Sequence, residues 1–350
     1  MIKLKKSVES LNAYFVNDMP CRIKLDANEG SNYLLKNGLN FDMTNINLYP
    51  DSDARLLREK MAEYYGCSAK NIIVGNGSSE LVNMVINAFC EKGDRVVSFT
   101  PSFSMYKTYC DLCGAQFTGV ETEEDFTQNI DLLIEKSLNV RAKAVILCTP
   151  NNPTGYMTEK TDVVKLLDSV KDSLIVVDEA YIDFSNFDNI SSVDLINKYD
   201  NLIVMRTLSK AFGLAGLRVG AMIGNEELIN YIWKVKVPYN MNALSQYTAA
   251  EALKNTAMVR DYVRDTAGLR DKLKDDLRAL NFTVFNSGAN FLFMKSPIDR
   301  LYEELMNRGI LIRKFSFDGE VYYRITVGTE AENAALLEEI KNIAGGQNEK

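Results

Sequence analysis

The sequence predicts an α/β protein with a mostly parallel sheet covered by helices on both faces, together with a smaller α+β domain. From about residue 45 to 240, short apolar runs alternate with helical patterns, which is typical of a parallel sheet. The pattern changes after Pro238, where a long helical stretch precedes several short strands. With 350 residues, 46% of them hydrophobic, the chain is long enough for one large and one small domain.

Six apolar runs of the first region are predicted strands, because each is short and is followed by turn-forming or polar residues. They span residues 72–74, 95–99, 144–148, 174–177, 202–205 and 219–223. The segment between the first two runs predicts a helix over 79–90, since Leu81, Val85, Ala88 and Phe89 share one face. Strand alternating with helix again favours a sheet covered on both sides.

The second region predicts the smaller domain. A helical stretch from 243 to 280 has few breakers. Short strands are predicted near 282–285, 290–294, 310–313 and 322–327, with helices near 298–308 and 330–343. We expect residues 45–240 to form the large domain, and residues 1–44 with 241–350 to form the small one. No flexible linker separates them, so the two domains are expected to pack closely.

The composition excludes several classes of function. The net charge of −7 argues against nucleic acid or an anionic membrane as the main partner. No apolar stretch has the length of a membrane span and no signal-peptide core follows Met1, so we expect a cytoplasmic protein. The absence of histidine excludes Ser-His and Cys-His catalysis and histidine-ligated metals. Cys110 and Cys113 form a single CxxC without a second pair, so we expect no metal site.

Lys210 has the sequence context of a reactive amine. It follows the apolar run 202–205, and α/β proteins place their ligands at the carboxyl ends of strands. Partial desolvation there lowers the pKa of a lysine, so that the neutral amine can attack a carbonyl. Ser209 and Arg218 are suitable partners for a phosphate. A carbonyl beside a phosphate describes pyridoxal 5′-phosphate.

Two other strand ends carry polar groups. Residues 75–77 form a glycine turn before Ser78 and Ser79, and a glycine turn at a helix N-terminus presents free N–H groups to an anion. An ordinary N-cap serine is the alternative interpretation. Asp178 ends the run 174–177 and is a candidate partner for a protonated pyridine nitrogen, or else an acidic turn residue. Tyr181 follows closely enough to reach the phenolic oxygen of such a ring.

Two further loops offer groups to a planar ligand. Residues 149–155 form a stiff loop with two prolines and a glycine, from which Asn152 can aim its amide inward. After the run 95–99, the aromatic rings of Phe103 and Tyr106 are candidates for stacking on a flat cofactor. Core packing is the alternative, and we assign Phe103 to the core.

Taken together, these segments are more specific than any one alone. The chain resembles the fold-type-I pyridoxal-phosphate aminotransferases of class I and II, and within them it is similar to the histidinol-phosphate aminotransferases. The similarity extends from Leu25 to Gly328 and is most specific in residues 149–155, 177–181 and 207–218. It implies a pyridoxal-phosphate cofactor, a homodimer, and amino transfer between histidinol phosphate or a related amine and 2-oxoglutarate.

The resemblance also implies a role for each site residue. Lys210 forms the aldimine with the cofactor and moves the proton between the substrate Cα and the cofactor C4′. Asp178 pairs with the pyridinium nitrogen, while Asn152 and Tyr181 contact the ring oxygen. The remaining cofactor ligands are Ser78, Ser79, Ser209 and Arg218 at the phosphate, Tyr49 of the partner subunit at the same phosphate, and Tyr106 stacked on the ring.

By the same resemblance, Arg324 binds the carboxylate of glutamate or the phosphate of the amino substrate, with Arg313, Tyr14 and Asn152 assisting. An arginine fork suits both anions, which would let one site serve two substrates in turn. The chain departs from the family at Gly30-Ser31, where an asparagine-proline is usual, and at Asn12-Ala13-Tyr14, where a proline-tyrosine is usual. These departures concern the substrate and not the cofactor.

Other functions remain open in the sequence. A threonine-phosphate decarboxylase or an aromatic amino acid aminotransferase would share the cofactor residues. A nucleotide-binding oxidoreductase would need GxGxxG, and residues 75–80 lack the third glycine. A non-catalytic regulator with this fold is disfavoured by the retained Lys210.

Overall fold

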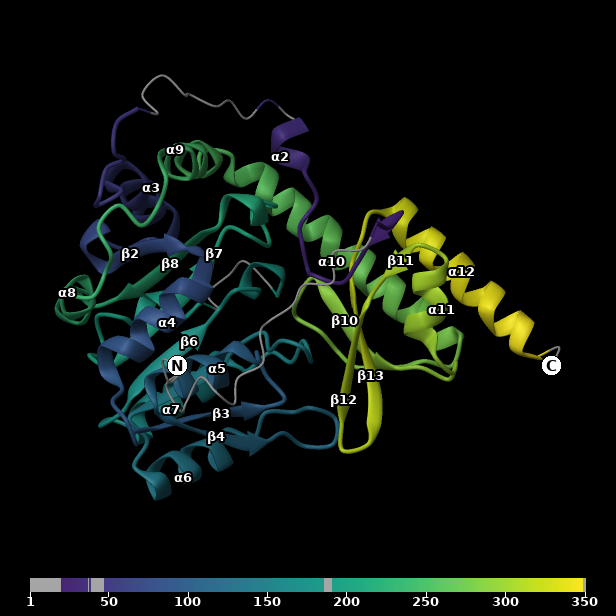
Figure 1. The fold of residues 1–350 in the computed structure, drawn as a ribbon, viewed down its shortest axis with the longest axis horizontal. Helices are drawn as coiled ribbons and strands as arrows, with labels where there is room; N and C mark the ends of the chain where they lie inside the picture. The colour runs from purple at the N-terminus through teal and green to yellow at the C-terminus, as the bar shows by residue number, and fades with distance from the viewer. Residues whose placement is uncertain (1–19, 37, 39–46, 186–190, 349–350) are drawn as a thin grey trace, which may run out of the picture.

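A computed structural model describes residues 20–36, 38, 47–185 and 191–348, and in this part of the chain a seven-stranded sheet forms the centre of the larger half (Figure 1). Its strand order is β2-β8-β7-β6-β5-β3-β4. The strands are β2 (Ile72–Asn76), β3 (Arg95–Thr100), β4 (Gln116–Glu121), β5 (Ala144–Cys148), β6 (Leu174–Asp178), β7 (Leu202–Thr207) and β8 (Val219–Gly224). Only β8 is antiparallel to its neighbours, β2 and β7, which confirms the prediction of a mostly parallel sheet.

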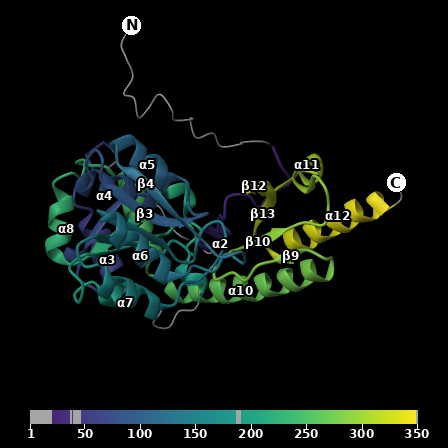
Figure 2. The same ribbon diagram turned by 90° about the horizontal axis from the view of Figure 1, so that it is seen from below.

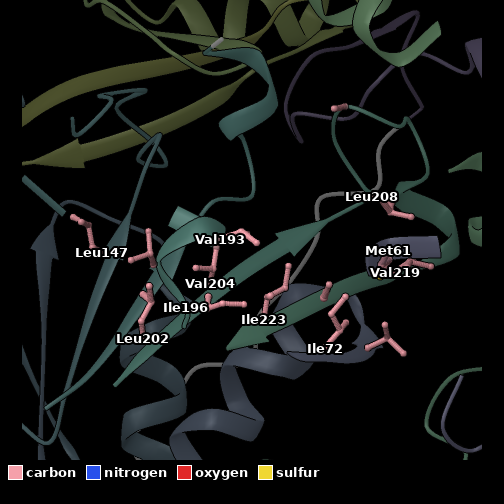
Figure 3. Packing of buried hydrophobic residues seen from close by; sticks show 14 of the residues in the cluster. Met61, Ile72, Leu147, Val193, Ile196, Leu202, Val204, Leu208, Val219 and Ile223 are labelled. Atoms are coloured by element: carbon pink, nitrogen blue, oxygen red, sulfur yellow. The ribbon is translucent and has the colours of Figure 1, made fainter. Parts of the chain in front are cut away.

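Helices cover both faces of this sheet, because alternate side chains of each strand point to opposite sides. On β6, Ile175 and Val177 belong to one buried cluster and Val176 to the other. The first face carries α3 (Arg55–Tyr65), α6 (Ile130–Val140), α7 (Lys160–Ser169) and α9 (Ala243–Ala252). The second carries α4 (Gly77–Phe89), α5 (Met105–Cys113) and α8 (Glu226–Trp233). Figure 3 shows the first cluster, with Val204 and Ile223 near Val193 and Ile196.

A second, antiparallel sheet lies in the smaller half, with the order β12-β13-β10-β9. These strands are β9 (Thr283–Val284), β10 (Phe291–Lys295), β12 (Arg313–Phe317) and β13 (Glu320–Thr326). Two helices pack with it, α11 (Leu301–Asn307) and α12 (Glu330–Asn348). The N-terminal strand β1 (Ile23–Lys24) pairs in parallel with β11 (Ile310–Leu311), so residues from both ends of the chain build this half. The short helix α2 (Tyr33–Lys36) follows, and its Leu34 belongs to a buried cluster of the large sheet.

Helix α10 (Thr256–Ala279) joins the two halves (Figure 2). Its first turns place Val259 and Val263 in a core of the large sheet, and its later turns place Leu273 and Leu277 in the core of the small sheet. One helix buried at both ends fixes the halves relative to each other, as the lack of a flexible linker predicted. The predicted boundaries near residues 44 and 240 stay a prediction, since residues 39–46 lie outside the described part.

The structure corrects two boundary expectations. The predicted helical stretch 243–280 is two helices, because the backbone N–H groups of Lys254 and Asn255 bond to carbonyls three residues back and end α9. The predicted strand near 310–313 is divided between β11 and β12. Strand β4 was not predicted, since it lies at the edge of the sheet and buries only Val120. Among the described residues, no helix combines the length and the apolar content that crossing a membrane requires.

Candidate active site

A pocket lies where the ends of β5, β6 and β7 meet the start of α4. Carboxyl ends of parallel strands meet at one edge of a sheet, which is where such folds bind ligands. The structure brings eight of the predicted site residues to this pocket: Ser78, Ser79, Asn152, Asp178, Tyr181, Ser209, Lys210 and Arg218. Phe103, Cys148, Ala180 and Thr207 complete its lining.

Lys210 follows β7 and extends its amine into the pocket. Its Nζ donates a hydrogen bond to the carbonyl of Ala27 at 3.1 Å and lies 5.5 Å from the centre of the Tyr181 ring. Burial, together with the positive charges of Arg324 and Arg218, lowers the pKa of Lys210 to about 7. Near neutral pH a large share of this amine is therefore uncharged and nucleophilic.

Asp178 ends β6 and supplies a carboxylate to the pocket. The hydroxyl of Tyr106 donates to its Oδ2 at 2.7 Å, and the backbone N–H of Ala180 donates to its Oδ1 at 3.1 Å. Burial raises the pKa of Asp178, whereas these two hydrogen bonds favour its ionised form. A cationic group in the pocket would complete the pairing of this carboxylate.

The first turn of α4 and Arg218 together form a candidate anion-binding cradle. Gly77 has φ +77°, a conformation that favours glycine, and a Cβ there would lie 2.6 Å from the Nη2 atom of Arg218, so the guanidinium packs directly on this turn. Gly220 on β8 is equally close, since its Cβ would lie 2.5 Å from the backbone nitrogen of Ser78. Unpaired N–H groups at a helix start, two serines and one arginine together favour a phosphate.

Two aromatic residues lie differently from what the sequence predicts. Tyr106 is fully buried behind Asp178 and does not line the pocket, whereas Phe103, which we assigned to the core, does line it. The two rings meet edge to face at 5.5 Å. Phe103 is therefore the better candidate for contact with a flat ligand, and Tyr106 is a support for the Asp178 carboxylate.

Arg324 lies beside the pocket on β13, in the second sheet. Its Nη1 donates to Asn152 Oδ1 at 2.6 Å and its Nη2 donates to the carbonyl of Asp26 at 2.7 Å. Arg313 is its direct neighbour on β12, but it lines a separate 170 Å³ pocket together with Asp26.

Tyr49, the predicted phosphate ligand from the partner subunit, lies at the surface of its own chain. Tyr49 is 83% exposed, does not line the pocket and stacks on Tyr239 with ring centres 4.8 Å apart. Tyr14 lies outside the described residues. The role of Tyr49 at the phosphate and the role of Tyr14 beside Arg324 therefore stay predictions.

Asn28 is a pocket-supporting residue to which sequence reasoning gave no role. It is 1% exposed, and its Nδ2 donates to the hydroxyl oxygen of Tyr181 at 3.2 Å. The signal in the sequence was its place in the segment 25–29, where the resemblance begins. A polar residue after an apolar run is usually a surface turn, so its burial could not be seen in the sequence alone.

Comparison with known proteins identifies the family. The sequence model of aminotransferase class I and II matches residues 16–340, and the chain belongs to this family, as the sequence predicted. The chain is 38% identical to the histidinol-phosphate aminotransferase of Caldanaerobacter subterraneus subsp. tengcongensis, over 97% of this chain and 98% of that protein. It is 39% identical to the histidinol-phosphate aminotransferase of Thermoanaerobacter pseudethanolicus, with the same coverage of 97% and 98%.

The fold is also shared with solved structures. The histidinol-phosphate aminotransferase of Sinorhizobium meliloti, solved in complex with pyridoxal-5′-phosphate, superposes with a TM-score of 0.88 at 22% identity, over 98% of each chain. At this identity the likeness establishes the fold, and the sequence relatives establish the family.

Proposed function

We propose that the protein is a pyridoxal-phosphate enzyme that transfers the amino group of histidinol phosphate to 2-oxoglutarate. The observation that carries the proposal is the meeting of Lys210, Asp178 and the start of α4 in one pocket. The names of the relatives, which align over nearly their whole length, support the choice of substrate.

The residues present fit this cofactor group by group. A partly neutral amine at Lys210 suits the aldehyde, and the buried carboxylate of Asp178 suits a protonated ring nitrogen. The cradle of α4 and Arg218 suits the phosphate. Asn152 Oδ1 accepts a hydrogen bond from Arg324. The Nδ2 group of Asn152 is therefore the one that can donate a hydrogen bond to a ring oxygen.

Each of these residues then has one task in the reaction. When bound, the cofactor supplies an electron sink for the charge left at the substrate Cα. Lys210 Nζ removes the proton from that carbon and delivers it again, since its pKa of about 7 allows both protonation states near neutral pH. Asp178 keeps the ring nitrogen charged, and Arg324 holds the carboxylate or phosphate of the substrate in a planar fork.

We also propose a homodimer in which Tyr49 of the partner subunit reaches the phosphate cradle. The support is a group of exposed apolar residues, here called the Tyr49 patch, in which Tyr49 stacks on Tyr239; its other members are Leu48, Val235 and Val237. Contiguous exposed apolar side chains commonly mark a protein interface. The cytoplasmic location stays a prediction.

A substrate panel tests the proposed reaction. The purified holoenzyme is given histidinol phosphate, aromatic amino acids or threonine phosphate, with 2-oxoglutarate, and is assayed for glutamate and for carbon dioxide. We expect glutamate with histidinol phosphate and no carbon dioxide with any substrate. Lys210→Ala should abolish turnover, whereas Lys171→Ala, at an exposed lysine, should not. Release of carbon dioxide from threonine phosphate would favour a decarboxylase instead.

A further inference from the structure

Asn28 lies between the pocket and the second sheet. It belongs to the segment that connects β1 to α2, and its φ of +54° lies in the left-handed region that asparagine tolerates better than most residues. Its side chain contacts Tyr181 on one side, with Nδ2 to Oη at 3.2 Å, and Thr326 on the other, with Oδ1 to Oγ1 at 3.2 Å.

The direction of these hydrogen bonds follows from a backbone N–H group, which can donate a hydrogen bond but cannot accept one. The backbone N–H of Asn28 lies 2.9 Å from Thr326 Oγ1 and can only donate, so the threonine hydroxyl accepts there. That hydroxyl then has its own hydrogen to give to Asn28 Oδ1. An amide whose oxygen accepts must present its nitrogen to the other neighbour, so Tyr181 Oη receives a hydrogen bond from Asn28 Nδ2.

We propose that Asn28 is a positioning residue: by donating to the hydroxyl oxygen of Tyr181, it turns the hydroxyl hydrogen toward the ring oxygen of the bound cofactor. The inference rests on the proposed function, because it requires a cofactor oxygen opposite Tyr181. It adds the reason why Tyr181 acts as a donor to this oxygen and not as an acceptor.

Two further observations support this arrangement. Burial raises the pKa of Tyr181 to about 12, so its hydroxyl keeps its hydrogen at neutral pH and has one to donate. Both partners are also held in place. Asn290 Nδ2 donates to the carbonyl of Asn28 at 3.2 Å, and the Tyr181 ring packs edge to face on Phe291 at 5.1 Å. The hydroxyl of Tyr181 is thereby oriented by residues of β10 and β13.

The first test is Asn28→Asp in the holoenzyme. Aspartate tolerates the same φ, but its carboxylate only accepts, so it draws the Tyr181 hydrogen away from the pocket. The readout is the pH midpoint of the visible absorbance of the bound cofactor. A hydrogen bond donated to the ring oxygen stabilises the negative charge on that oxygen, so the cofactor loses the proton that changes its absorbance at a lower pH. Loss of this hydrogen bond should therefore raise the midpoint by about one pH unit, the size of one such hydrogen bond. Tyr181→Phe lacks the hydroxyl, so its midpoint shows the shift expected when this hydrogen bond is lost completely.

The second test changes Thr326, which holds the Asn28 amide from the side opposite Tyr181. Thr326→Val removes the hydroxyl that fixes the Asn28 amide and should raise the midpoint in the same direction. Thr326→Ser keeps the hydroxyl and should restore the wild-type value. Asn71→Asp is the matched control, because Asn71 is also buried but bonds to the carbonyl of Gly224, away from the pocket. It should leave the midpoint unchanged even if it lowers stability.

The double variant Asn28→Asp with Tyr181→Phe decides whether Asn28 acts through Tyr181. We expect its midpoint to equal that of Tyr181→Phe alone. An additional shift in the double variant, a wild-type midpoint in both Asn28→Asp and Thr326→Val, or no shift in Tyr181→Phe would overturn the inference. A wild-type protein that binds no chromophore would instead refute the proposed function, so the two failures are distinguishable.

Discussion

The amine of Lys210 is uncharged for much of the time because burial, Arg324 and Arg218 all disfavour its protonated form. The sequence could predict where Lys210 and Asp178 lie, since Asp178 directly follows one apolar run and Lys210 comes shortly after another, and both runs proved to be buried strands. It assigned Phe103 to the core and Tyr106 to the cofactor ring, whereas of these two only Phe103 lines the pocket. These aromatic residues are three positions apart, and which one faces the pocket depends on how α5 and the turn before it sit on the sheet.

The lowered pKa of Lys210 predicts how capture of the cofactor depends on pH. Only the neutral amine attacks an aldehyde, so the rate at which the apoprotein binds pyridoxal phosphate covalently should fall about tenfold per pH unit below pH 7 and level off above it. Stopped-flow absorbance at constant ionic strength measures this rate. A rate that still rises steeply up to pH 10 would show that the amine has the pKa of an ordinary lysine.

Two neighbouring arginines predict different effects on substrate binding. Arg324→Lys keeps the charge but loses the planar fork, so the KM of the amino substrate and of 2-oxoglutarate should rise about tenfold or more. Arg313→Lys, on the adjacent strand but facing another pocket, should change KM much less. Steady-state kinetics of both variants provide the comparison. Equal effects would remove the special role assigned to Arg324.

At the scale of elements, the strands that carry the site could be predicted, because their apolar runs are buried on both faces. β4 could not, since at the edge of the sheet it buries only Val120. The break between α9 and α10 could not either, because no proline or glycine marks it. Behind the site, buried Arg206 of β7 pairs with Glu179 at 3.2 Å and with Asp183 at 2.6 Å. These pairs join the strand before Lys210 to the segment after Asp178.

The close approach of β8 to α4 predicts a selective loss of cofactor affinity. In Gly220→Ala the new Cβ would press on the backbone of Gly77 and Ser78 and distort the cradle. Such overpacking costs about 1–3 kcal/mol, so pyridoxal phosphate should bind roughly tenfold or more weakly. Titration of the apoprotein, followed by cofactor absorbance, measures the affinity.

Gly268→Ala is the control for this change, because a Cβ at that position in α10 meets no atom within 4 Å. It should leave affinity unchanged and stabilise the helix by about 0.4–1 kcal/mol. Wild-type affinity in Gly220→Ala would contradict the close contact that the structure shows.

At the scale of the whole molecule, the segment that follows β1 runs beside the pocket and contacts Tyr181 and the Lys210 loop. A Cβ at Gly30 would collide with the carbonyl oxygen of Lys210, and one at Gly213 with that of Ser31, so the two backbones touch directly. The sequence showed Gly30 only as a departure from the family's usual residues. It could not show this contact, since the partners are about 180 residues apart.

The Tyr49 patch predicts the effect of a charge introduced at one of its residues. Val237→Glu should convert a dimer to a monomer in sedimentation equilibrium and weaken cofactor binding, because Tyr49 of the partner subunit would no longer reach the phosphate. Leu138→Glu places the same charge at an exposed apolar residue of α6 and should change neither property. A wild-type protein that sediments as a monomer and still binds the cofactor tightly would refute the proposed dimer.

The central claim is that the side-chain amine of Lys210 attaches the cofactor. The most direct measurement is borohydride reduction of the holoenzyme, followed by proteolysis and mass spectrometry of the labelled peptide. The account predicts a single modified lysine, Lys210, and loss of the visible absorbance band on reduction. A label on another lysine, or no label in a protein that turns over substrate, would contradict it.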